Sequence, residues 1–142
     1  MPDSENDARS LTPPTPPSQD WFLSALVTIM NSLRGAGLGI TLQVGGLLVT
    51  GQLASGADYL EETGEGLDAA LTGGKRDSIA KAMGELAEKL YSNEKQAPGY
   101  IHIRNARFFK PGANGIPQES KKWWRGRLSE VDGFIIGAMQ EG

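Results

Sequence analysis

The sequence contains no cysteine and only one histidine, His102, among its 142 residues. Without cysteine, the chain cannot form a disulfide scaffold, a thiolate zinc site or a cysteine nucleophile. A lone histidine leaves carboxylates as the main side chains from which a metal site or a catalytic triad could be built. We therefore expect the protein to use no metal and no other cofactor.

Long apolar runs are also missing. The longest apolar-rich segment, residues 21–33, is interrupted by polar side chains and falls short of the roughly 20 residues that span a membrane. The chain begins with acidic residues, whereas a secretory signal begins with basic ones followed by an apolar stretch. These features predict a cytoplasmic protein that has no membrane partner.

What is present fits one globular domain. Hydrophobic side chains make up 39% of the residues and charged ones 22%, and the formal net charge is -3. Residues 1–18 differ, because they hold five of the eight prolines and almost no large apolar side chain besides Leu11. Such a segment buries too little surface to offset the entropy of ordering it. We predict a disordered, proline-rich tail over residues 1–18 and a single domain over residues 19–142.

The first half of the domain predicts a helix, a β-hairpin and a helical insertion. Asp20 is a good helix N-cap, and apolar residues follow it at a spacing of three and four. Residues 40–53 alternate in polarity around two adjacent glycines, which is typical of a hairpin with a tight turn. Ser55 and Asp77 are the predicted caps of two further helices.

The second half predicts three strands. In chain order these are Tyr100–Phe109, Lys122–Glu130 and Phe134–Met139, with a hairpin turn at Asp132-Gly133. Glycines inside predicted strands mark bulges or corners that bend a sheet, here Gly51, Gly126 and Gly137. The predicted fold is α+β: an N-terminal helix plus a five-stranded antiparallel curled sheet or small barrel (Sm-like or SH3-like), with a helical insertion between strands 2 and 3. An open antiparallel sheet packed on helices is the second possibility.

The residues that could indicate an enzyme do not stand in the required context. The glycine-rich residues 35–37 precede a strand instead of following one, and Gly74-Lys75 is followed by arginine where a phosphate loop has serine or threonine. His102 alternates with isoleucines and is predicted to be a surface or interface residue. The carboxylates of the second helix are predicted to form a solvated face: Asp58, Glu61, Glu62, Glu65 and Asp68. We expect no enzyme and no catalytic residue.

Charge is distributed unevenly along the chain. Residues 1–99 hold 7 basic and 13 acidic side chains, and residues 100–142 hold 7 and 4, which gives -6 and +3. Strand alternation places Trp124 and Leu128 on the core face, with Trp123 and the neighbouring arginines on the other face. The candidate interaction residues are Trp123, Arg125, Arg127, Arg104 and Arg107. Three interpretations stay open: an outer face that is solvated or meets the acidic helices, a protein-contact surface, and a nucleic-acid surface. The acidic chain argues against strong phosphate binding.

Three stretches together resemble the gas vesicle accessory protein U family. The first is the hairpin segment 39–51, which follows the helix start Asp20-Trp21-Phe22. The second is Tyr100-Ile-His-Ile-Arg-Asn-Ala106, and the third runs from Trp124-Arg-Gly through Glu-Val-Asp-Gly-Phe to Gly137. The last is the most specific, because its two motifs in that order are unusual. The resemblance covers roughly residues 20 to 139.

The resemblance implies a non-enzymatic accessory role in gas vesicles, the hollow protein shells that give certain prokaryotes buoyancy. It implies a part in the clustering of assembled vesicles, with gas vesicle proteins as partners. From the basic and aromatic bias of the last strands we hypothesise that the protein promotes clustering or regulates assembly through multivalent protein–protein contacts. The same segments share the Sm-like order of helix, hairpin and strands, an analogy of pattern that makes an Sm-like RNA-binding oligomer the alternative function. Unpaired strand edges favour a homo-oligomer.

Overall fold

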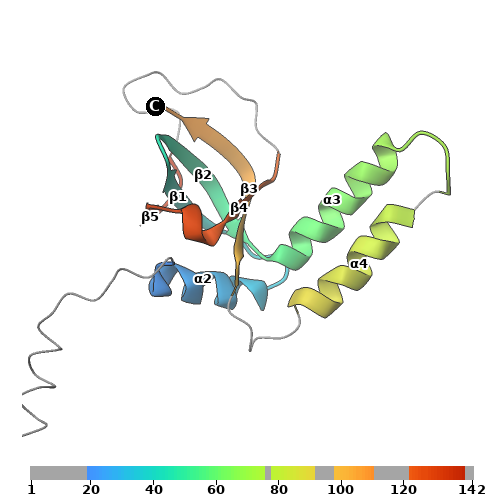
Figure 1. The fold of residues 1–142 in the computed structure, drawn as a ribbon, viewed down its shortest axis with the longest axis horizontal. Helices are drawn as coiled ribbons and strands as arrows, with labels where there is room; N and C mark the ends of the chain where they lie inside the picture. Colours follow the sequence, from blue (N-terminus) through green and yellow to red (C-terminus); the bar gives the residue numbers. More distant parts are fainter. Residues whose placement is uncertain (1–18, 76–77, 92–97, 111–121, 140–142) are drawn as a thin grey trace, which may run out of the picture.

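The computed structural model describes residues 19–75, 78–91, 98–110 and 122–139. The chain folds as α+β, and the five strands form one antiparallel sheet in the order β4-β3-β2-β1-β5 (Figure 1). The elements in chain order are α2 (Trp21–Asn31), β1 (Leu38–Val44), β2 (Leu47–Ala54), α3 (Gly56–Ala70), α4 (Ser78–Tyr91), β3 (Tyr100–Phe109), β4 (Trp124–Arg127), the 3-10 helix η1 (Leu128–Glu130) and β5 (Gly133–Ile136). The predicted helix, the five strands and the insertion between strands 2 and 3 are confirmed.

The sheet is open, so the small-barrel form of the prediction is wrong. Strands β4 and β5 have four residues each and lie at opposite edges, which also contradicts the predicted hairpin at Asp132-Gly133. The two strands are separated by η1, whose Leu128 side chain is buried in the core. Beyond it, Asp132 is fixed at the β1–β2 turn, where its N–H donates to the Gln43 carbonyl and its carboxylate accepts from the Gly45 N–H at 3.0 Å. The chain therefore reaches β1 instead of turning back on β4.

One face of the sheet and helix α2 form the core. Asp20 begins α2, because its carboxylate accepts hydrogen bonds from the Phe22 and Leu23 N–H groups at 2.8 and 3.3 Å. The buried stripe of α2 packs against apolar side chains of β1, β2 and β3. The buried apolar cluster consists of Leu23, Val27, Met30, Ile40, Leu42, Val49, Leu53, Ile101, Ile103, Ala106 and Leu128. Trp124 packs against this cluster, as predicted.

A β-bulge in β3 keeps its apolar residues on the core face. The pairing register between β2 and β3 shifts after Thr50, and Asn105 adopts a positive φ of 54°. Without the extra residue, Ala106 would face away from Ile103. Gly51 lies opposite this bulge, where an added Cβ would lie 2.7 Å from the Arg104 carbonyl oxygen. The predicted bend at Gly51 is therefore a close approach of two backbones.

Helices α3 and α4 form a hairpin that projects away from the sheet (Figure 1). Glycines of α3 allow the close contact, since a Cβ on Gly64 would lie 3.0 Å from Met83 and one on Gly56 would overlap the Tyr91 ring. Asp68 ties the helices together, because its carboxylate accepts from the Ile79 and Ala80 N–H groups at 2.9 and 2.8 Å. The predicted cap Asp77 lies outside the described residues.

The segment after β5 crosses the face of the sheet opposite to α2. The hydroxyls of Thr41 and Thr50 are buried there and lie 3.0 Å apart. Thr41 donates to the Gly137 carbonyl at 2.8 Å, and Thr50 accepts from the Met139 N–H at 2.7 Å. Because Gly137 has a φ of 116°, β5 ends at Ile136 and is shorter than predicted.

Candidate functional site

The predicted basic and aromatic residues lie on the face of β3 and β4 that points away from the α2 core. In the β3–β4 register, Tyr100 is opposite Arg127 and His102 is opposite Arg125. Strand alternation continues this pattern to Arg104 beside Trp123. We call these six residues the outer-face ladder: Tyr100, His102, Arg104, Trp123, Arg125 and Arg127.

Two cation–π contacts connect the strands of the outer-face ladder. The Arg125 guanidinium lies 3.7 Å from the centre of the Tyr100 ring, and the Arg104 guanidinium lies 4.8 Å from that of Trp123. The Arg125 Nε–H also donates to His102 Nε2 at 3.2 Å. The Tyr100 ring and His102 Nε2 therefore hold the Arg125 guanidinium in place, although Arg125 is exposed to solvent.

His102 is buried, so its prediction as a surface or interface histidine is wrong. The residue is 1% exposed, and its ring lies 4.7 Å from that of Tyr59 and 5.8 Å from that of Tyr91. Both tyrosines come from the helical hairpin, which covers the middle of the outer-face ladder. Burial, together with the positive charge of Arg125, lowers the pKa of His102 to about 3.

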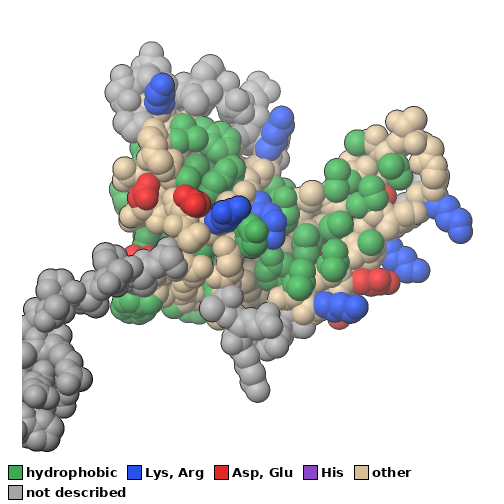
Figure 2. Space-filling model, in the orientation of Figure 1, with side chains coloured by type: hydrophobic (Ala, Val, Ile, Leu, Met, Phe, Trp, Pro, Cys, Tyr) green, Lys and Arg blue, Asp and Glu red, His purple; other side chains and the backbone are tan. Residues whose placement is uncertain are grey.

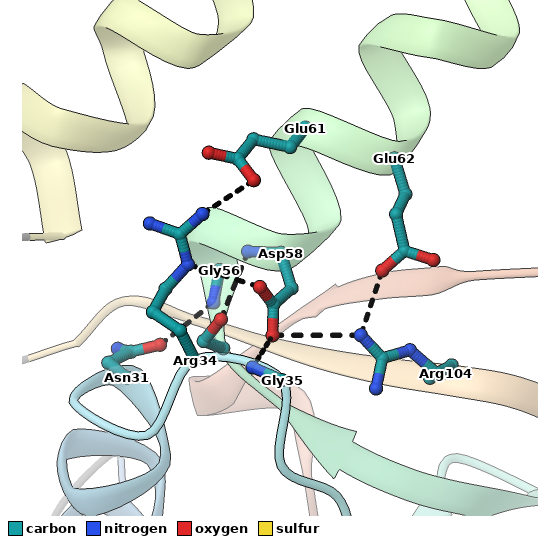
Figure 3. Close-up of polar contacts among 9 residues, drawn as sticks. Asn31, Arg34, Gly35, Gly56, Asp58, Glu61, Glu62 and Arg104 are labelled. Carbon is teal, nitrogen blue, oxygen red and sulfur yellow. Dashed lines mark hydrogen bonds and ion pairs between the residues drawn. The ribbon is translucent and has the colours of Figure 1, made fainter.

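The acidic residues of α3 do not form a simple solvated face, because Asp58 is buried at the base of the helix (Figure 3). Its carboxylate accepts from the Gly35 N–H at 2.6 Å and from Arg34 Nε at 3.1 Å. Arg104 lies 3.6 Å from Asp58 and 2.8 Å from Glu62. The cluster joins the end of α2, the start of α3 and strand β3.

The pKa of the Asp58 carboxyl is lowered, although burial alone would raise it. The hydrogen bonds from the Gly35 N–H, Arg34 and Ser55, and the charge of Arg34, outweigh the burial. Conversely, the Glu61 and Asp58 carboxylates raise the pKa of Arg34. Asp58 is therefore ionised at neutral pH and holds its two arginine partners by charge.

The five candidate interaction residues differ in their exposure to solvent and in the residues that they contact. Arg125 and Arg127 are exposed on the edge strand, and Trp123 is half-buried, with its ring 5.5 Å from that of Tyr59. Arg104 lies between Trp123 and the acidic start of α3. Arg107 lies beyond the bulge, where it donates to the Met139 carbonyl and lies over the Phe109 ring. The structure thus gathers four of the five residues on the outer-face ladder and leaves Arg107 apart.

Sequence reasoning missed the residues that organise this site, namely Asp58, Tyr59 and Tyr91. The spacing of Ser55 and Asp58 does indicate a helix start, and the Asp58 N–H donates to Ser55 Oγ at 3.0 Å. A carboxylate in the first turn, directly after a buried strand, is close to the sheet. That position distinguishes Asp58 from the acidic residues farther along α3.

Metal-binding clusters and membrane-spanning helices are two features that the described part of the chain lacks. Its histidine, aspartate and glutamate side chains form no group of three or more that could hold a metal ion. None of its helices is long and apolar enough to cross a membrane.

Comparison with known protein families gives a match over most of the chain. The sequence model of a protein family described as gas vesicle protein GvpU-like matches residues 20–139. No curated protein and no solved structure matches the chain. The matched residues include every helix and strand described above.

Proposed function

The chain belongs to the gas vesicle protein GvpU-like family, and from this premise we propose that it is a non-enzymatic accessory protein that clusters gas vesicles or regulates their assembly. In this proposal it is located in the cytoplasm with the vesicles. It acts as an oligomer that contacts gas vesicle proteins repeatedly and weakly. Because linked weak contacts bind far more tightly than single ones, such an oligomer can bridge two vesicles without one large interface.

The observation that supports this proposal is the exposed edge of the outer-face ladder. Arg125 and Arg127 project from a strand in the part of the sequence that carries an excess of positive charge. The Tyr100 ring and His102 Nε2 hold the Arg125 guanidinium in place, which reduces the conformational entropy lost on binding. An acidic protein surface is the partner that fits two exposed guanidinium groups.

The other candidate residues have supporting roles in the proposal. Trp123 contributes an apolar ring next to the guanidinium groups, and aromatic and arginine side chains are enriched in protein interfaces. Arg104 orients Trp123 and is partly neutralised by Asp58 and Glu62. Arg107 extends the basic face beyond the bulge.

Charge reversal tests this function. We expect the double variant Arg125→Glu and Arg127→Glu to lose at least about tenfold in vesicle association, because two attractive contacts become repulsive in every copy of the oligomer. Co-sedimentation with purified vesicles measures association, and turbidity measures clustering.

The matched control reverses two exposed lysines of α4, Lys81→Glu and Lys89→Glu, and changes the net charge by the same amount. This control should retain association and clustering. The proposal would be abandoned if the arginine variant, shown to be folded by circular dichroism, clustered vesicles as well as the unchanged protein.

A further inference from the structure

Helix α2 has an unusual surface for a helix that covers one face of a sheet. Residues 21–33 contain no charged side chain, yet Trp21 is 77% exposed and several other large apolar side chains lie on the surface. These are Phe22, Ile29 and Leu33. A helix at the surface of a monomer normally presents charged residues to water, and a helix that is apolar all round is normally covered.

The neighbouring edge of the sheet is equally unprotected. In the described part of the chain, β5 has a strand partner on one side only, and its residues Gly133–Ile136 carry no charge. Ile135 is 68% exposed, and Ile136 is exposed as well. The opposite edge strand, β4, carries Arg125 and Arg127, and charges of this kind prevent edge-to-edge pairing. Only the β4 edge therefore has such protection.

These two features form one surface. The Phe22 ring lies 5.8 Å from that of Phe134 in β5, and Trp21 lies 5.8 Å from Phe22. Figure 1 shows β5 and the start of α2 on one side of the molecule and the α3–α4 hairpin on the other. We call Trp21, Phe22 and residues 133–136 the uncharged edge.

The backbone of the uncharged edge can pair with itself. Ile135 is opposite Thr41 of β1, and the Gly137 N–H donates to the Gly39 carbonyl at 2.7 Å. Backbone groups alternate along a strand, so those of residues 135 and 137 face β1, and those of Phe134 and Ile136 face outward. In an antiparallel pair centred on Ile135, Phe134 of each copy is opposite Ile136 of the other copy. The outward N–H and C=O groups then meet their partners without a shift in register.

We propose that a second copy of this chain binds the uncharged edge, with β5 pairing antiparallel to β5 about a two-fold axis at Ile135. A two-fold interface places residues near the axis against their own copies, so any charge there would meet the same charge. The uncharged edge meets this requirement. The apolar side chains on the helical hairpin do not, because α3 carries exposed carboxylates on that surface, among them Glu62 and Glu65.

The dimer rests on the proposed function in one respect, since that function requires an oligomer, and it adds the surface at which two copies associate. Pairing at β5 leaves β4, at the other end of the sheet order, uncovered in each copy. Two outer-face ladders would then lie at the two ends of one continuous sheet. This arrangement supplies the second copy that bridging requires.

Light scattering after gel filtration tests the dimer. The unchanged protein should elute with twice its 15.2 kDa mass at micromolar concentrations. Ile135→Lys, at an exposed position, should keep the fold but weaken dimerisation at least tenfold, because two ammonium groups would meet at the axis. Ile136→Pro should act similarly by removing an outward N–H. Leu90→Lys, at an exposed site on α4, should remain dimeric.

A crosslinking experiment tests the register. The chain has no cysteine, so Ile135→Cys introduces a single thiol, and in the proposed pair two such thiols face each other with Cα atoms about 4.5 Å apart. Diamide, which takes up the two protons and two electrons released, should join them within the dimer. Leu90→Cys should crosslink far less. A monomeric unchanged protein, or a dimer that persists in Ile135→Lys, would overturn the inference.

The dimer and the proposed function can fail separately. The double variant of Arg125 and Arg127 should remain dimeric, since both residues lie at the opposite edge. If it is dimeric and still clusters vesicles, the proposed function is wrong and the dimer is supported. If Ile135→Lys has the same mass as the unchanged protein while the arginine variant loses clustering, the dimer interface is wrong and the function is supported.

Discussion

Replacing Asp58 by asparagine is expected to lower the free energy of unfolding by about 3 kcal/mol, because it removes the buried charge that holds two arginines. The amide keeps the size of the side chain but turns one acceptor into a donor, which then faces the Gly35 N–H or the Arg34 guanidinium. The cluster joins α2, α3 and β3 (Figure 3), so the helical hairpin should also be held less firmly. Urea denaturation at neutral pH measures the loss.

The control for this prediction is Glu61→Gln. Glu61 also pairs with Arg34, but both side chains are nearly half exposed, and surface ion pairs contribute about 0 to 1 kcal/mol. The free energy of unfolding of this variant should therefore be much closer to that of the unchanged protein. Equal losses for the two variants would show that burial of Asp58 is not what makes its contacts important.

Acidification from pH 7 to pH 5 is expected to lower the free energy of unfolding by about 2 kcal/mol through His102 alone. Its pKa is about 3 in the folded protein, compared with about 6.5 in an unfolded chain. The unfolded state therefore binds a proton as the pH falls below about 6.5, and the folded state does not until the pH approaches 3. The contribution of His102 to the free energy of unfolding is therefore fully present above about pH 6.5. It decreases steadily as the pH falls from there toward 3.

His102→Phe isolates the effect, because the chain has no other histidine and a ring still fills the space between Tyr59 and Tyr91. Urea denaturation of both proteins at several pH values gives the free energy of unfolding as a function of pH. Between pH 7 and pH 5 this free energy should decrease only in the protein that contains the histidine. A slope that is equally steep in the variant would assign the acid sensitivity to carboxylates such as Asp58, whose pKa is also lowered.

The apolar patterns of the sequence predicted most of the fold. Alternation defined β1, β2 and β3, and the Asp20 and Ser55 caps defined the starts of α2 and α3. Each of these signals depends on neighbouring residues. They are reliable for that reason, because no distant contact is needed to form a cap or a turn.

The errors arose where a distant contact decides the structure. Asp132-Gly133 has the composition of a hairpin turn, yet contacts with Gln43 and Gly45 fix Asp132 beside β1. His102 alternates as a surface residue would, yet Tyr59 and Tyr91 cover it from the helical hairpin. A single sequence does not reveal where that hairpin lies against the sheet.

The candidate site shows the same division. Alternation correctly assigned Trp124 to the core and placed Arg125 and Arg127 on the exposed face. It could not show that Arg104 is engaged by Asp58 and Glu62 from α3. The exposed arginines of the outer-face ladder can therefore be predicted from the sequence. The contacts that Asp58 and Glu62 make with Arg104 become visible only in the fold.

The space-filling view in Figure 2 shows the side chains on one face of the molecule. In the view of Figure 2, apolar side chains gather over the helical hairpin, and basic side chains lie both between the hairpin and the sheet and at the far side of the hairpin. More than one surface therefore offers contacts to a partner. Among these surfaces, we assign the contact with gas vesicle proteins to the outer-face ladder.

The central claim is that the outer-face ladder is the surface that contacts gas vesicles. Hydrogen exchange of the protein with and without purified vesicles tests this claim most directly, because it locates the contact on the chain. We predict that vesicles slow amide exchange in residues 122–127 and in the facing part of β3, residues 100–104, and leave the α3–α4 hairpin unchanged. Protection confined to the hairpin, with residues 122–127 exchanging as in the free protein, would contradict the account.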